Sequence, residues 1–139
     1  MSLSAGQSAP LPTIEVSWGE LVDKITILEI KQQRLTSPQA VANVRRELVA
    51  LRRVYDHLGP TSAKLETLKW ELKAVNETLW NIENSTRAKE AAKTFDHEFI
   101  GLTRSVYQNN DRRARIKREI NEVLRSGLVE EKQYTSYQV

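Results

Sequence analysis

Two matched heptad stripes constrain the fold of this chain more than any other feature of its sequence. Before Gly59, apolar residues recur at alternating spacings of three and four: Val41, Val44, Leu48, Leu51, Tyr55 and Leu58. After Pro60 the same spacing returns in Leu65, Leu68, Leu72, Val75, Leu79 and Ile82. Such a stripe forms one apolar face of a helix and packs against another stripe. Because Gly59 and Pro60 form a helix stop between the stripes, the pattern predicts an antiparallel hairpin of two long helices with coiled-coil packing.

A further helix is expected before this hairpin. Ser17 and Glu20 have the spacing of a capping box, in which each side chain caps the backbone N–H of the other residue. They predict a first helix that runs to about Leu35. Because apolar residues lie on two sides of this helix, we expect it to be central in the fold or to lie in an interface.

Shorter helices are expected after the hairpin. Thr94 or Asp96 is expected to cap a helix, residues 109–111 to break it, and a last helix to end between Arg125 and Gly127. With 139 residues, 40% hydrophobic and only five Gly, the chain fits one all-α domain, an antiparallel helical bundle built on the long hairpin.

The expected organisation has three parts. Residues 1–12 are read as a flexible N-terminal arm that includes a cloning scar, residues 13–127 as the helical bundle domain, and residues 128–139 as a docked or flexible tail. Residues 13–16 alternate like a very short strand, beside which the tail could pair.

Several functional classes receive little support from the sequence. The amino terminus has no export signal, which indicates a cytoplasmic protein, and no segment is apolar enough to indicate a membrane partner. There is no Cys, the two His residues lack metal-ligand spacing, and no Gly-rich phosphate loop occurs. We therefore expect no metal and no cofactor, and catalytic residues are not identified.

One polar stripe is the candidate binding site. On a helical wheel it borders the apolar seam of the second long helix, and residues from the following helices fall on the same side. The residues that could converge there are Asn76, Glu83, Arg87, Glu90, Arg104, Tyr107, Arg113 and Lys117.

Two interpretations of this stripe stay open. It could form a pocket for an anionic small molecule, with Arg side chains as bidentate donors and Glu83 or Glu90 as a proton acceptor, which would also suit an enzyme. It could instead be an ion-pair network that fixes helix register, and we favour this interpretation. The surplus of positive charge in the set supports the ligand hypothesis, because a structural network should be close to neutral.

A basic run over residues 112–118 raises the alternative of nucleic-acid binding. Acidic residues follow it at Glu119 and Glu122, and no aromatic residue is interleaved for base stacking. We therefore favour a solvated helix face over a nucleic-acid surface.

The chain also resembles a known family in segments that cover about residues 16–137. These segments are Ser17–Lys31, Val75–Glu83, Phe95–Asp96, Phe99–Ile100, Arg104–Tyr107, Asn110–Ala114, Ile116–Asn121 and Leu128–Lys132. They resemble a bacterial family of uncharacterised proteins, domain of unknown function 6165. The resemblance implies a bacterial, soluble, single-domain protein and implies no reaction.

Among the open classes, the heptads alone suffice for a helical oligomeric interaction or scaffold protein, which is our preferred prediction. We expect a homodimer formed through the first helix or the hairpin, because apolar surface that a thin hairpin leaves uncovered usually marks an interface.

Overall fold

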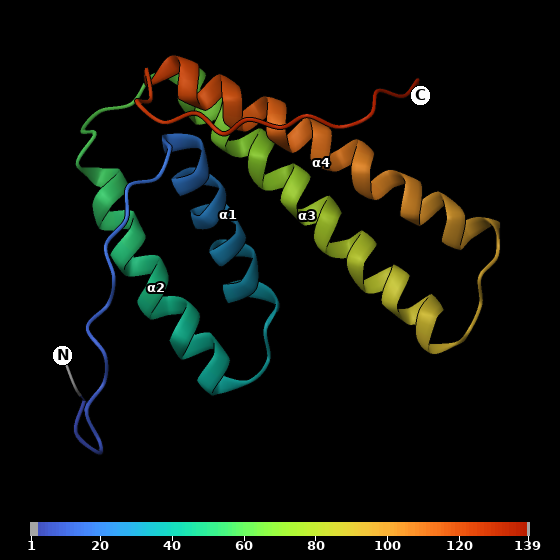
Figure 1. The fold of residues 1–139 in the computed structure, drawn as a ribbon, viewed down its shortest axis with the longest axis horizontal. Coiled ribbons are helices and arrows are strands. Elements are labelled where there is room, and N and C mark those ends of the chain that lie inside the picture. Colours follow the sequence, from blue (N-terminus) through green and yellow to red (C-terminus); the bar gives the residue numbers. More distant parts are fainter. Residues whose placement is uncertain (1–2, 139) are drawn as a thin grey trace.

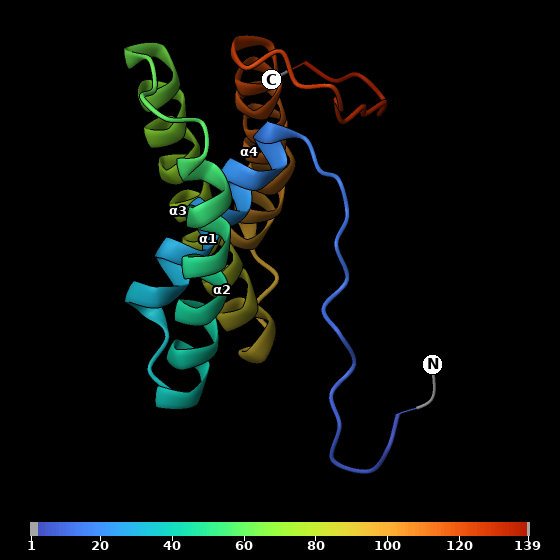
Figure 2. The ribbon, with the colours of Figure 1, turned by 90° about the vertical axis from the view of Figure 1, so that its left-hand side faces the viewer.

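The computed structural model describes residues 3–138, and its secondary structure there consists of α-helices. They are α1 (Trp18–Arg34), α2 (Pro38–Asp56), α3 (Ala63–Ala91) and α4 (His97–Val123), arranged as a bundle (Figure 1). The predicted all-α class and the bundle are therefore confirmed. Residues 13–16 do not form the expected strand, and residues 3–16 are exposed and extend away from the helices (Figure 2). Two residues of the predicted arm and scar, Met1 and Ser2, lie outside the described range, as does Val139 of the tail.

Local capping explains where the helices begin. The Oγ of Ser17 accepts a hydrogen bond from the backbone N–H of Glu20 at 3.1 Å, and the Ser62 Oγ accepts one from Leu65 at the same distance. Ser37 and Asp96 cap α2 and α4 in the same way. The helix starts predicted at Ser17 and at Asp96 are thus confirmed. The reciprocal half of the capping box is wrong, however, because the Glu20 carboxylate turns to Lys117 instead.

The pairing of the helices differs from the prediction. Within residues 3–138, α1 packs against α2, α3 and α4, and α3 packs along α4, whereas no close backbone contact joins α2 to α3. The chain does turn at Gly59, whose φ of 72° lies in the left-handed region. From that turn α2 and α3 diverge, and α1 lies between them (Figure 1). The apolar stripes of α2 and α3 both pack onto α1 instead of onto each other. The long helical hairpin of this fold is therefore α3–α4.

The predicted break at residues 109–111 is also wrong, since α4 continues through it as one helix. Helix propensity disfavours Asn and Asp, because their side chains compete for backbone groups. In α4 these side chains find partners that leave the helix intact: the Asn109 amide donates to the carbonyl of Ser105, and the Asn110 amide oxygen accepts from Arg113. The helix therefore passes through the expected break.

Helix α1 is central, as its two-sided apolar pattern predicted. Leu21, Val22, Ile25 and Leu28 are buried in one hydrophobic cluster with side chains of the other three helices. The two apolar sides of α1 are thus covered within one chain. The expectation that this helix mediates a dimer consequently loses its motivation.

Helices α3 and α4 extend beyond this core. A helix rises 1.5 Å per residue, so the 29 residues of α3 span roughly 43 Å while the 17 residues of α1 span only roughly 25 Å. The far ends of α3 and α4 and the turn between them therefore form a two-helix projection, which we call the distal arm and define as residues 83–108 (Figure 1).

The tail follows α4 back toward the distal arm. It is extended, and it contacts α4 through side chains, with Glu131 paired to Arg118 and the hydroxyl of Tyr137 donating to Asp111. The ring of Tyr137 also meets Tyr107 edge to face, with centroids 5.0 Å apart.

Candidate functional site

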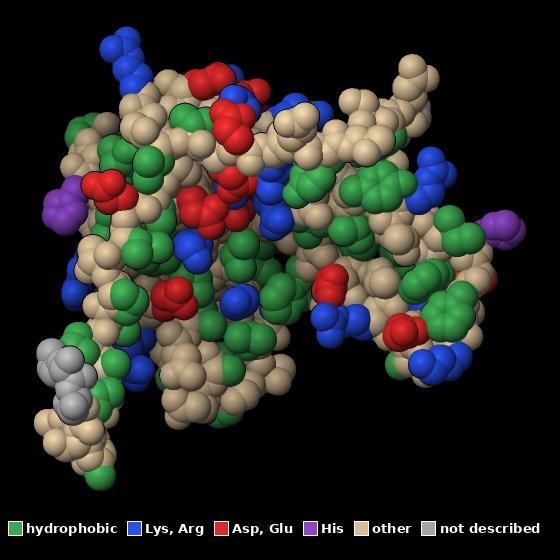
Figure 3. Space-filling view, viewed as in Figure 1, with side chains coloured by type: hydrophobic (Ala, Val, Ile, Leu, Met, Phe, Trp, Pro, Cys, Tyr) green, Lys and Arg blue, Asp and Glu red, His purple; other side chains and the backbone are tan. Residues whose placement is uncertain are grey.

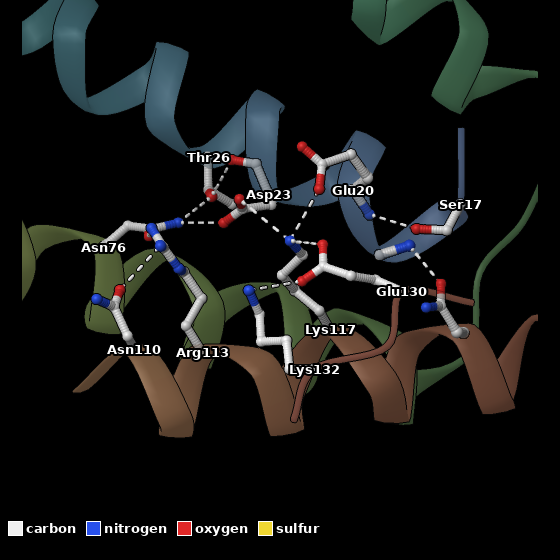
Figure 4. Close-up of polar contacts among 12 residues, drawn as sticks. Ser17, Glu20, Asp23, Thr26, Asn76, Asn110, Arg113, Lys117, Glu130 and Lys132 are labelled. Atoms are coloured by element: carbon white, nitrogen blue, oxygen red, sulfur yellow. Dashed lines mark hydrogen bonds and ion pairs between the residues drawn. The ribbon is translucent and has the colours of Figure 1, made fainter. Parts of the chain in front are cut away.

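A partly buried polar cluster lies where α1 crosses α3 and α4, and the tail closes one side of it (Figure 4). Its members come from α1 and its N-cap, from α3 and α4, and from the tail. They are Ser17, Glu20, Asp23, Thr26, Asn76, Asn110, Arg113, Lys117, Asn121, Glu130 and Lys132. We call this set the polar cluster.

Lys117 is the centre of the polar cluster. Its ammonium Nζ lies 2.8 Å from Glu20 Oε2, 3.1 Å from Glu130 Oε2 and 3.8 Å from Asp23 Oδ2, and its side chain is only 10% exposed. Burial alone lowers the pKa of Lys117, but the hydrogen bond with Glu20 and the charge of Asp23 outweigh that effect and raise it above 10.5. Lys117 is thus held as a cation among three carboxylates.

The other half of the polar cluster is a chain of hydrogen bonds through Asn76. The Asn76 amide donates to Asp23 Oδ1 at 2.9 Å and to Thr26 Oγ1 at 3.0 Å. Its amide oxygen accepts from the Arg113 guanidinium at 3.3 Å, and Arg113 also donates to Asn110 at 2.9 Å. Asp23 therefore connects the two halves, since its second oxygen faces Lys117.

Glycine permits the close approach of α1 to α4 at one end of the polar cluster. The backbone N–H of Gly19 donates to Asn121 Oδ1 at 2.7 Å. A Cβ at Gly19 would lie 2.5 Å from the carbonyl oxygen of Lys117, which is closer than side-chain atoms tolerate. The positions of Lys117 and Glu20 thus depend on the absence of a side chain at residue 19.

The structure brings together three of the eight predicted site residues, Asn76, Arg113 and Lys117. Glu83 and Arg87 pair with each other at 2.7 Å, and both are exposed on the distal arm. Glu90 and Arg104 are also exposed, and neither forms a side-chain hydrogen bond or ion pair within residues 3–138. Tyr107 lies under Tyr137 of the tail, apart from the polar cluster.

Sequence reasoning missed the acidic members of the polar cluster, namely Glu20, Asp23 and Glu130. A signal for two of them was present: Glu20, Asp23 and Thr26 recur at a spacing of three on a helix that is otherwise apolar on two sides. Glu130 gave no such signal, because it reaches Lys117 from an extended tail.

The polar cluster is balanced in charge. Glu20, Asp23 and Glu130 offset Arg113, Lys117 and Lys132, and no buried side-chain polar atom in the described chain lacks a hydrogen-bond partner. The surplus positive charge expected for the eight predicted residues does not gather here, because Arg87 and Arg104 lie outside. A neutral, fully bonded network is what helix registration requires.

Surface hollows lie beside α4 and beside α2 in the described part of the chain. One, of about 180 Å³, lies between α4 and the tail, beside Lys117 and Glu130. The other, of about 470 Å³, lies on the outer side of α2. No group of three or more His, Cys, Asp or Glu within residues 3–138 is arranged to hold a metal ion. None of the four helices described there has the length and apolar character needed to cross a membrane.

The distal arm is the largest part of the fold without a buried core. No side chain from residue 83 to residue 108 is fully buried, although Phe99, Leu102 and Val106 are half-buried. Phe95, Ile100 and Tyr107 are 56%, 51% and 41% exposed. Hydrophobic side chains gather over this region on the face shown in Figure 3.

Comparison with known proteins places the chain in a family without assigning it an activity. No curated protein and no solved structure is significantly similar to it. Residues 12–138, nearly the whole chain, match a family described as "Family of unknown function (DUF6165)". This match confirms the resemblance found in the sequence, and the chain belongs to that family.

Proposed function

We propose that this protein is a helical interaction protein that assembles as a homodimer through its distal arm. The observation that carries this proposal is the absence of any fully buried side chain between residues 83 and 108, in a segment with three exposed aromatic or aliphatic side chains. Exposed apolar side chains that gather in one part of a protein often mark a contact site.

The thickness of the distal arm explains why it needs a partner. Two helices can cover only one side of each other, and α1 ends at Arg34, whose guanidinium bonds to Asn81 just before the distal arm begins. In the proposed dimer, the arms of two copies pack side by side and make four helices around one apolar seam. A two-fold axis suits such an interface, because the same patch then serves both copies.

The charges of the distal arm favour a second copy as its partner. Residues 83–108 contain four acidic residues and four basic residues, so two arms do not repel each other. Several of these charges are already paired within the arm: Glu83 with Arg87, and Lys89 with Asp96 and Glu98, each at about 3 Å. A neutral surface with an apolar centre fits its own copy better than it fits a strongly charged partner.

The polar cluster supports a structural role more than ligand binding. Its charges balance and its buried polar atoms are bonded, so a bound anion would have to displace existing partners. The ligand site of eight residues stays a prediction. A thermal-shift screen of phosphates and dicarboxylates on wild type and Arg113→Ala tests it, and a ligand-induced shift lost in the variant would support it.

Light scattering coupled to size exclusion tests the dimer. Wild type at tens of micromolar should give about twice the chain mass of 16.0 kDa. The double variant Phe95→Glu/Ile100→Glu should give about 16 kDa with unchanged helical circular dichroism, because both positions are exposed in the single chain. Placing charge in an apolar interface costs far more than placing it in water.

Trp70→Glu is the matched control. Trp70 is 71% exposed on α3 but lies outside the distal arm, so this variant should remain dimeric. A wild-type protein that is monomeric at these concentrations contradicts the proposal. So does a double variant that remains a dimer while folded.

A further inference from the structure

The outer face of α2 carries three arginines around an apolar hollow. We define this face as Ala42, Arg45, Arg46, Val49, Ala50 and Arg53, the residues that line the hollow of about 470 Å³. All three Arg side chains are exposed, and Val49 is 44% exposed. The opposite side of α2 packs into the core through Val44, Leu48 and Tyr55. The outer face is thus held rigid by the core and open to solvent.

None of these three arginines has an acidic partner within residues 3–138. Arg52, one position away from Arg53, does have one, because its guanidinium lies 2.8 Å from Glu29 of α1. Helix α2 holds four Arg against Glu47 and Asp56, a surplus of two within a chain whose net charge is +3. Helix α4 holds the same surplus of two, six basic residues against four acidic ones, so the two helices differ in how their charges are paired.

The basic run of α4 differs from the outer face of α2 in this respect. Lys117 is compensated by Glu20, Asp23 and Glu130, Arg118 by Glu131, and Arg113 is engaged with two Asn side chains. Only Arg112 and Arg115 of the run are exposed without an acidic partner in the described chain. The outer face of α2 therefore holds more unpaired basic residues than the basic run of α4.

We infer that the outer face of α2 is a docking site for an acidic amphipathic helix of a partner protein. Residues 42, 46, 49 and 53 recur at spacings of four, three and four, which is the ridge that a second helix packs against. Ala42, Val49 and Ala50 accommodate apolar side chains of the partner, and the guanidinium groups that alternate with them on this face bind its carboxylates.

The composition of the outer face favours a protein partner over nucleic acid or membrane. Binding of single-stranded nucleic acid relies on aromatic side chains for base stacking, and membrane-surface helices use Trp, Phe or Leu on the buried side. The outer face of α2 has no aromatic residue and no Leu. Arg forks beside Ala and Val match a helix in which Glu or Asp flanks an apolar stripe.

Fluorescence anisotropy on the full-length protein tests this inference. The probe is a labelled helical peptide of Glu, Ala and Leu, with Leu at i, i+4 and i+7 and Glu flanking them. Its partner probe has every Glu replaced by Gln. Wild type should bind the Glu peptide at least tenfold more tightly than the Gln peptide, and added salt should weaken the binding.

Matched charge reversals locate the site. Arg45→Glu/Arg53→Glu should weaken binding of the Glu peptide at least tenfold, whereas Arg112→Glu/Arg115→Glu, the same charge change on exposed positions of α4, should change it less than twofold. Val49→Ser removes apolar surface from the site and should weaken binding about threefold. A purely electrostatic site would not respond to this substitution. Phe95→Glu/Ile100→Glu should bind the peptide like wild type, since the inference does not depend on the distal arm.

Three outcomes overturn the inference. One is the absence of binding to the Glu peptide, and another is an equal loss in the α4 double variant. The third is tighter binding of a 20-base-pair DNA duplex or of phosphatidylserine vesicles that is itself lost in Arg45→Glu/Arg53→Glu. That result would assign the outer face of α2 to a different class of partner.

Discussion

Gly19 lies where α1 and α4 approach each other most closely. Gly19→Ala places a Cβ 2.5 Å from the Lys117 carbonyl oxygen and 3.0 Å from Asn121 Oδ1, so the helices must separate. Overpacking of this kind costs about 2 kcal/mol, and here it also strains the bond between Gly19 and Asn121. We expect urea unfolding to show that loss of stability.

Gly101→Ala is the control for this substitution. Gly101 lies in α4 with no atom within 4 Å of a Cβ built there. Because alanine favours a helix over glycine by roughly 1 kcal/mol, this variant should be slightly more stable than wild type. If both substitutions change the free energy of unfolding alike, the close contact of α1 with α4 is wrong.

Alkaline pH should destabilise the protein through residues that hold their protons more tightly when folded. Burial and the neighbouring carboxylate of Glu66 raise the pKa of Tyr55 from 10.0 to about 12. The pKa of Lys117 is also raised, by its hydrogen bond with Glu20 and the charge of Asp23. A group with a raised pKa contributes its full stabilisation below its unfolded pKa and loses it as pH rises through the folded pKa. Stability should therefore fall between pH 10 and about 12.

Urea midpoints measured across this pH range check the expectation. Tyr55→Phe removes the titrating hydroxyl and its 3.3 Å hydrogen bond to Glu66, so its stability should decline less steeply with pH than that of wild type. Absorbance at 295 nm reports the ionisation of the tyrosines directly. Parallel declines for the two proteins would exclude Tyr55 as a cause.

At the scale of elements, the end of α3 depends on a non-glycine residue in the left-handed region. Lys93 has a φ of 55°, while the N–H of Thr94 bonds to the carbonyl of Lys89 and the N–H of Lys93 to that of Glu90. This is a Schellman motif, in which glycine is the preferred residue. Lys93→Gly should therefore raise the melting temperature by a few degrees, as calorimetry would show, and Lys64→Gly in the first turn of α3 should lower it.

Helix starts such as those at Ser17 and Asp96 could be predicted because their causes are local. Ser17, Ser37, Ser62 and Asp96 each cap a backbone N–H within three residues, so the signal and its effect lie in one short segment. The pairing of helices could not be predicted in this way. A heptad stripe shows which face of α2 or α3 is apolar but not which helix covers that face. In this fold α1 packs against the apolar faces of both helices.

The candidate site shows the same limit. Asn76, Arg113 and Lys117 were found because each departs from the pattern of its own helix. Asp23 and Glu130, which bind them, belong to elements 53 residues before Asn76 and 13 residues after Lys117. Such partners become visible only once the tertiary contacts are known, and they change the charge of the cluster from positive to balanced.

At the scale of the whole molecule, the tail is held to the fold less firmly than any of the four helices. Among residues 3–138, no backbone–backbone hydrogen bond joins residues 128–138 to a helix. The tail is held instead by side chains: Glu130 with Lys117, Glu131 with Arg118, and Tyr137 with Asp111. Exposed ion pairs contribute little, and ordering an extended segment opposes them.

We therefore expect a chain that ends at Gly127 to keep its helical fold. Deleting residues 128–139 should leave the helical far-UV circular dichroism signal of the chain unchanged. It should lower the melting temperature by roughly 2 to 5 °C, which is the effect of losing a few surface contacts in a domain of this size. Lys117 keeps Glu20 and Asp23 in the shortened chain, so the polar cluster should hold without Glu130.

The full-length variant Glu130→Gln/Tyr137→Phe should reproduce most of the decrease, because it removes the carboxylate that faces Lys117 and the hydroxyl that bonds to Asp111. Deletion of residues 1–12, which are exposed where described, is the control and should leave the melting temperature unchanged. A shortened chain that unfolds would show that the tail contributes more stability than these contacts allow. One that melts at the wild-type temperature would show that the tail contributes less.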